Sequence, residues 1–347
     1  MNKKLRNILT LSLAFLSVVT FAQSFDLDSR TRANMHGDNS MMLVEQRATV
    51  STTLGGADWG IHLSSDVNFL HQDGSNGTVA AGVYEAYAKT NLFSFADLTI
   101  GRQAWDFGSG ALIGSNQWAA VRTTRDGMLF DIENDMVDLS LGYSLFNNGV
   151  GDEDWTYTLI NASKNFGDIT ANALVIQQND GVNDELNCLG LDLGYTTMGG
   201  ALDLSLGMNT VTMGDDEMEM TSIGATYNVT DDLSISASQT TYGDQGFAMA
   251  GTNLGYGQDS WLTHGNIGYM DPNDEHLQIG VDYSMGGIDL SYTMHTVTND
   301  DDEWNASELT VGYNLNDNAA LALKYATSDL YNVDGDDFMW LSLSVTP

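Results

Sequence analysis

The sequence has very little cysteine, proline or positive charge. Cys188 is the single cysteine, which excludes a framework of internal disulfides. The only prolines are Pro272 and Pro347, so long strands can form without interruption by this residue. Twelve Lys and Arg stand against 47 Asp and Glu, a formal charge of −35 at pH 7. Nucleic acid is therefore not an expected partner, because the chain would repel its phosphates.

Long apolar runs are absent beyond the N-terminus, so no membrane-spanning helix is predicted. At the N-terminus, three basic residues precede an apolar run over 8–21 and the small residue Ala22. This order is typical of a secretory signal peptide. We predict cleavage after Ala22, which leaves 23–347 as a single domain with a formal charge of 9 − 47 = −38. An uncleaved anchor helix is the alternative.

What the chain has instead is alternation of apolar and polar residues. Apolar residues take every second position in 137–143, 202–208, 277–283, 288–294 and 309–315. This period of two indicates β-strands. The intervening residues are mainly Gly, Ser, Thr, Asn and Asp, which fits lipid on one face and water on the other. We predict an all-β transmembrane antiparallel barrel; a soluble all-β fold is the alternative.

Short and long connections alternate between the predicted strands. The short ones lie at 55–56, 166–168, 198–200, 230–232, 285–287 and 316–318. The long ones lie at 101–125, 147–154, 178–185, 214–219, 243–275, 299–304 and 329–337. Outer-membrane barrels have short periplasmic turns and long extracellular loops. We therefore predict about 18 strands (16–20), with both termini periplasmic. We assign 261–269 to a loop, although as a strand it would raise the count to 20.

Four tyrosines support this arrangement. Tyr195, Tyr227, Tyr283 and Tyr313 each precede a predicted short turn by a few residues. Barrels that span a membrane concentrate aromatic rings at both lipid–water boundaries. We predict that these tyrosines form part of the periplasmic girdle.

Charged residues of the first strands are predicted to face the lumen. Seven of the nine basic residues in the predicted mature chain precede residue 126, which predicts an asymmetric lumen. A charge facing lipid near the midplane costs about 2–4 kcal/mol, so the charged face of each strand should point inward. These residues either tune solute selectivity or only pair across strands to fill the wall. The set comprises Asp26, Asp28, Arg30, Arg32, Glu45, Arg47, Asp66, Glu85 and Lys89.

The stretch 101–127 carries a more specific pattern. It begins Gly-Arg-Gln-Ala-Trp-Asp-Phe-Gly, continues through Leu-Ile-Gly-Ser-Asn-Gln-Trp, and ends with Arg122, Arg125 and Asp126 before Gly127. This pattern resembles the alginate-export outer-membrane family, which has 18-stranded barrels with an arginine-containing conduit. The resemblance implies that Arg102, Arg122, Arg125 and Asp126 are pore or constriction groups.

No motif points to catalysis or to a bound cofactor. The six histidines form no recognisable motif with Ser or Asp, so no enzyme activity is predicted. The acidic run 299–303 lacks the spaced oxygen ligands of a dedicated Ca²⁺ loop, so no metal site is predicted either.

The predicted function is a monomeric, water-filled outer-membrane porin for passive diffusion of small hydrophilic solutes, with a preference for cations. The expected partners are outer-membrane lipid, lipopolysaccharide and, during biogenesis, the barrel assembly machinery. A saccharide or uronate conduit is the alternative within transport. A surface-binding or adhesion barrel and a barrel enzyme are the alternatives in other classes.

Overall fold

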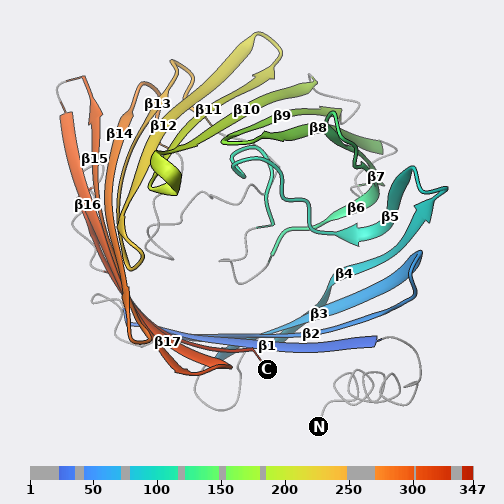
Figure 1. The fold of residues 1–347 in the computed structure, drawn as a ribbon, viewed down its shortest axis with the longest axis horizontal. Coiled ribbons are helices and arrows are strands. Elements are labelled where there is room, and N and C mark those ends of the chain that lie inside the picture. Colours follow the sequence, from blue (N-terminus) through green and yellow to red (C-terminus); the bar gives the residue numbers. More distant parts are fainter. Residues whose placement is uncertain are drawn as a thin grey trace.

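The computed structural model describes residues 23–35, 43–71, 79–115, 122–147, 154–179, 185–247, 270–300, 302–329 and 338–346. Within these ranges 18 antiparallel strands form one closed sheet (Figure 1). Closure comes from β1, which pairs with both β2 and β18. None of the described helices is long and apolar enough to cross a membrane. The predicted signal peptide and the segment 261–269 lie outside the described residues.

Each strand pairs with its neighbours in chain order. The strands are β1 (Gln23–Asn34), β2 (Leu43–Gly55), β3 (Trp59–His71), β4 (Val79–Leu92), β5 (Ala96–Gln103), β6 (Arg125–Ile132), β7 (Asp138–Asn147), β8 (Asp154–Phe166), β9 (Ile169–Asn179), β10 (Leu186–Thr197), β11 (Leu202–Met213), β12 (Asp216–Thr230), β13 (Leu233–Tyr242), β14 (Glu275–Met285), β15 (Ile288–Asn299), β16 (Asp302–Asn316), β17 (Ala319–Ser328) and β18 (Phe338–Val345). A short 3₁₀ helix, η1 (Met198–Gly200), joins β10 to β11.

The predicted count of 18 strands and the predicted short turns are confirmed. All six predicted short connections join consecutive strands at one end of the barrel, which we call the turn end. Two further short connections at this end, at 93–95 and 133–137, complete the series. The opposite end, which we call the loop end, carries the longer connections.

Two connections that we predicted to be long are tight hairpins. β11 ends at Met213 and β12 begins at Asp216, while β15 ends at Asn299 and β16 begins at Asp302. Several of their acidic residues are part of the paired strands, as in the partners Glu217 with Thr212 and Glu303 with Thr298. β12 and β16 are 15 residues long, so they extend beyond the apolar band into water, where acidic side chains are tolerated.

The two faces of the wall differ as the alternation predicts. On β14 the residues 277, 279, 281 and 283 are exposed apolar or aromatic side chains, whereas His276 on the other face is buried. The same holds on other strands, so the outer surface is an apolar band. The tyrosines 195, 227, 283 and 313 are exposed and sit near the turn end, in the position expected of a girdle.

Arginine substitutions on the two faces should have opposite consequences. Leu204 and Leu290 are exposed on the outer face, and Ser205 and Ser291 follow them on the lumen face. We expect Leu204→Arg or Leu290→Arg to destabilise the assembled barrel by about 2–4 kcal/mol, and Ser205→Arg or Ser291→Arg to be tolerated. Heat-modifiable gel migration of the refolded proteins measures this. Equal yields from both pairs would contradict the face assignment.

Candidate functional site: the inner loop and the arginine wall

The connection between β5 and β6 enters the barrel; we call residues 104–124 the inner loop, of which 104–115 and 122–124 are described (Figure 1). Its apolar side chains pack on the lumen face of β7–β11. Trp105 and Leu112 are 2% and 1% exposed. Glycines make room for both: a Cβ on Gly142 would lie 3.0 Å from the Trp105 ring, and one on Gly190 would lie 2.8 Å from Leu112. The loop is therefore seated against one side of the lumen.

Polar contacts fix the turn of the inner loop. The backbone N–H of Ser109 donates to Asp192 Oδ2 on β10 over 2.9 Å. Within the loop, the N–H of Ser115 donates to Asp106 Oδ1 over 2.6 Å. These contacts hold the described part of the loop against the β7–β11 side of the lumen.

Arg122, near the end of the inner loop, reaches β2, β3 and β4. Its guanidinium forms an ion pair with Asp66 at 2.5 Å, donates to Thr49 Oγ1 over 3.1 Å, and lies 3.5 Å from the centre of the Tyr84 ring. Both charged side chains are less than 10% exposed. A buried pair of this kind depends on both partners, because either charge alone would be uncompensated.

A β-bulge on β4 brings Tyr84 to this contact. The pairing of β3 with β4 shifts register between Ser64 and Ser65, so Tyr84 and Glu85 both point to the lumen. Glu85 accepts a hydrogen bond of 3.0 Å from the N–H of Ala104 at the start of the inner loop. Strict alternation would place Tyr84 outside, which is why the sequence pattern did not identify it.

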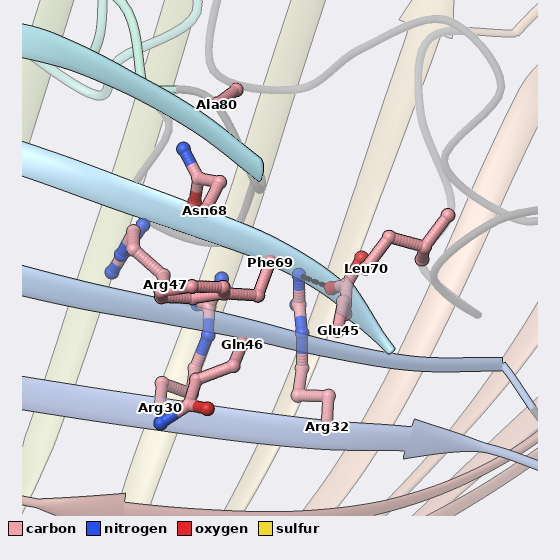
Figure 2. A pocket seen from close by; sticks show the side chains of 9 residues that line it. All are labelled: Arg30, Arg32, Glu45, Gln46, Arg47, Asn68, Phe69, Leu70 and Ala80. Atoms are coloured by element: carbon pink, nitrogen blue, oxygen red, sulfur yellow. Dashed lines mark ion pairs between the residues drawn. The ribbon is translucent and has the colours of Figure 1, made fainter. Parts of the chain in front are cut away.

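Arginines of β1 and β2 form what we call the arginine wall, namely Arg30, Arg32 and Arg47. They line a cavity of about 230 Å³ on the lumen side (Figure 2). Arg32 is 1% exposed; it forms an ion pair with Glu45, and its guanidinium lies 4.8 Å from the centre of the Trp340 ring. Arg30 and Arg47 are direct cross-strand partners. Two like charges opposite each other repel, and the carboxylates of Glu45 and Asp66 are close enough to offset part of this repulsion.

Most of the other predicted lumen residues also lie on the inner face. Asp26 and Asp28 share the face of Arg30 on β1, nearer the turn end. Lys89 forms an ion pair with Asp97 of β5 at 2.7 Å, also toward the turn end. The guanidinium of Arg125 lies 4.7 Å from the centre of the Tyr157 ring. The structure thus brings Arg30, Arg32, Glu45, Arg47, Asp66, Glu85 and Arg122 into one region of the lumen, whereas Asp26 and Lys89 lie nearer the turn end.

Arg102 and Asp126 depart from their predicted position at the constriction. They are cross-strand partners joined by two hydrogen bonds of 2.6 and 2.7 Å, and they are 42% and 52% exposed. Alternation puts Arg102 on the outer face with Ile100, whereas Gln103 is buried on the inner face. The cause is that β5 is still a regular strand at Arg102, and the chain turns inward only beyond it.

Comparisons with known proteins identify the family of this chain. Residues 10–332 match the family model described as Gram-negative porin. No curated protein sequence matches the chain. The resemblance to alginate export is not supported, because the family found is that of Gram-negative porins.

Solved structures agree on the fold. OpdK of Pseudomonas aeruginosa, in a structure with vanillate, is 13% identical over 94% of this chain and 98% of that chain, with a TM-score of 0.73. OccK11 (OpdR) of the same organism is 16% identical over 93% and 95%, with a TM-score of 0.70. OccAB2 of Acinetobacter baumannii is 13% identical over 94% and 98%, with a TM-score of 0.69.

Outer-membrane porins of this kind are monomeric channels for small solutes rather than enzymes. The apolar outer band, the closed barrel and the polar lumen with its seated loop are what such a channel requires. The chain therefore belongs to the Gram-negative porin family and forms a channel for small solutes in the bacterial outer membrane.

Proposed function

We propose that this porin conducts small solutes by passive diffusion, that it favours solutes with a carboxylate, and that it prefers small cations to small anions. The observation that carries the first preference is the arginine wall. The inner loop occupies the β7–β11 side of the lumen, so a solute passes beside β1–β4, where Arg30 and Arg47 face each other. A carboxylate placed between them would relieve their repulsion and accept charge-assisted hydrogen bonds.

One structural relative supports the choice of solute. The structure of OpdK contains vanillate, an aromatic carboxylate. The two chains share only 13% identity, so the comparison supplies a probe rather than an assignment. Vanillate is small and carries one carboxylate, the group that the arginine wall is proposed to bind.

The preference for cations rests on total charge. Acidic residues outnumber basic ones 47 to 12 in the whole chain, and carboxylates such as Asp203, Asp282 and Asp289 lie on the lumen face away from the arginine wall. Carboxylates concentrate small cations within about 10 Å at 0.1 M salt. A reversal potential of anion-selective sign in a KCl gradient at neutral pH would refute this preference.

Removing two arginines tests the carboxylate proposal. We expect Arg30→Gln with Arg47→Gln to raise the vanillate concentration that half-blocks KCl current by about tenfold, since one charge-assisted hydrogen bond contributes roughly 1.5–3 kcal/mol. Single-channel recording in planar bilayers measures the block. Lys164→Gln is the control for loss of a positive charge outside the arginine wall, because Lys164 lies on β8; it removes one charge where the double variant removes two. An unchanged block in the double variant would refute the proposal.

A saccharide or uronate conduit is the second candidate. The same arginine wall would bind a uronate carboxylate, and the lumen faces of β12–β15 carry Gly and Ser at many positions. Block by an oligouronate at lower concentration than by vanillate, combined with no block by a neutral oligosaccharide, would favour this candidate.

We also propose that residues 1–22 form a signal peptide that is removed on export, leaving 23–347 as one barrel domain. The basic start, the apolar run and Ala22 support this. Assembly by the barrel assembly machinery and contact with lipopolysaccharide follow from the location. N-terminal sequencing of the membrane-extracted protein should begin at Gln23.

A further inference from the structure

A second cavity lies between the inner loop and the turn end, on the lumen side of β8–β11; we call it the turn-end cavity. Its volume is about 470 Å³, within the range of roughly 300–1,000 Å³ that is usual for small-molecule pockets. None of the described residues that line it also lines the cavity of the arginine wall. Its lining includes the polar residues Ser109, Ser163, Thr170, Asn172, Asp192 and Ser205. The two cavities are therefore separate sites in one lumen.

Two of these side chains hold polar atoms that are not used by the fold. Asn172 Nδ2 and Asp192 Oδ1 are buried and have no hydrogen-bond partner among the described residues. The two residues are direct cross-strand partners on β9 and β10, and the other oxygen of Asp192 accepts the N–H of Ser109. The terminal torsion of an asparagine is broad, so its amide can turn toward the cavity that it lines. A bound group that both donates and accepts would remove the cost of leaving these atoms unpaired.

Glycines leave neighbouring hydroxyls uncovered on the same wall. A Cβ on Gly194 would lie 2.4 Å from Thr170 Oγ1, and one on Gly207 would lie 2.6 Å from Ser222 Oγ. A side chain at either position would therefore collide with a hydroxyl. Within the described part of the chain, the Thr170 hydroxyl makes no hydrogen bond. The wall thus presents hydroxyls as well as amides to a solute.

Charge and ring stacking do not favour an anion or an aromatic solute here. Lys164 and Asp138 also line the cavity, but both contact the backbone of Asn134: Lys164 Nζ donates to its carbonyl over 3.4 Å, and Asp138 Oδ1 accepts its N–H over 3.3 Å. Asp192 adds a second carboxylate, so a negatively charged solute would be repelled. No aromatic side chain occurs among the described lining residues, so a planar ring finds no stacking partner.

We propose that the turn-end cavity binds the hydroxyl groups of a neutral polyol the size of a monosaccharide, with Thr170 and Asn172 as binding residues. A sugar hydroxyl is both a donor and an acceptor, so it can donate to Asp192 while it accepts from Asn172. The inference rests on the passive diffusion of small solutes proposed above. It does not involve the arginine wall, because a neutral sugar carries no carboxylate.

Block of KCl current by glucose in planar bilayers tests the inference. We expect Thr170→Val with Asn172→Leu to raise the half-blocking glucose concentration about fivefold or more, since two hydrogen bonds to the sugar are lost. Thr310→Val with Asn314→Leu is the matched control, because it makes the same two changes on the lumen face of β16, outside the cavity. Triethylene glycol dimethyl ether has no hydroxyl, so it should affect the wild type and the double variant alike.

Thr170→Val alone keeps the shape of the side chain and is expected to raise the half-blocking concentration about twofold or more. The test therefore does not depend on folding of the double variant. Equal half-blocking concentrations in the wild type and both variants would overturn the inference. Block by putrescine at lower concentration than by glucose, weakened by the same variants, would also overturn it, because the cavity would then be a site for ammonium groups beside Asp192.

Swelling of proteoliposomes in glucose separates this inference from the function on which it rests. Swelling without any block of current by glucose would overturn the inference and leave passive diffusion intact. The absence of swelling would refute both, because glucose would then not pass through the lumen. Swelling together with a block that the variants weaken is the expected result.

Discussion

Replacing Leu112 and Ile113 with aspartate is expected to raise single-channel conductance by roughly twofold or more, because the conductance of a water-filled pore follows its narrowest section. Both side chains are buried on the lumen face of β7–β11, at 1% and 3% exposure. Burying a carboxylate without a partner costs several kcal/mol, so the inner loop should leave the wall rather than accept the charges. Planar-bilayer recording measures both the conductance and its noise.

The wall itself should survive this change. The strands are held by their own ladders, and the face released by the loop becomes exposed to lumen water. Ser109→Ala is the matched control within the same loop, since the hydrogen bond to Asp192 comes from the backbone N–H and is retained. Wild-type conductance in a folded Leu112→Asp, Ile113→Asp variant would show that another part of the chain sets the narrowest section.

The barrel was largely predictable because alternation and turn chemistry are local signals. Each strand has a period of two, and turns such as 285–287 are short glycine-rich breaks between apolar stretches. The face of each strand that points to the lumen was also predictable, because charges near the membrane midplane must face water. The lumen positions of Arg30, Arg47 and Asp66 could therefore be predicted from their strands alone.

Local sequence patterns gave wrong predictions where strands extend beyond the membrane and where a bulge shifts the alternation of inward and outward residues. Acidic residues at 214–219 resemble a loop, but these strands continue in water above the apolar band. The bulge at Tyr84 shifts the phase by one residue, and no residue type in the sequence marks it. The outer position of Arg102 could not be predicted without knowing where β5 ends and the inner loop begins.

Contacts between side chains of neighbouring strands could not be predicted from the sequence for a different reason. His276 and His295 are 19 residues apart, and Glu308 and Lys324 lie on the next two strands. Their contact depends on strand register, which fixes which residues face each other across four neighbours. The packing of Trp105 against Gly142 likewise depends on where the inner loop contacts the barrel wall.

The ion pair between Arg122 and Asp66 should be strongly coupled in a double-mutant cycle. Arg122→Met leaves the Asp66 carboxylate, 6% exposed, with the Thr49 hydroxyl at 2.7 Å and the nearby positive charge of Arg47. Breaking a buried pair by removing one partner costs about 3–5 kcal/mol. Asp66→Asn alone should also destabilise, because the Arg122 guanidinium then lies on Tyr84 without its carboxylate. Urea unfolding of the barrel in detergent measures each free energy.

The double variant Arg122→Met, Asp66→Asn removes both charges and should lose clearly less stability than the sum of the single variants, because no uncompensated charge remains. Measuring the ion selectivity of the wild type, the two single variants and the double variant provides an independent test of the same coupling. Arg122→Met should increase cation preference, Asp66→Asn should decrease it, and the double variant should return near the wild type, since the pair is neutral as a whole. Additive free energies would mean that the two side chains do not act as a pair. In that case the loop's contact with Tyr84, rather than the ion pair, would be what holds Arg122 at the lumen wall beside the arginine wall.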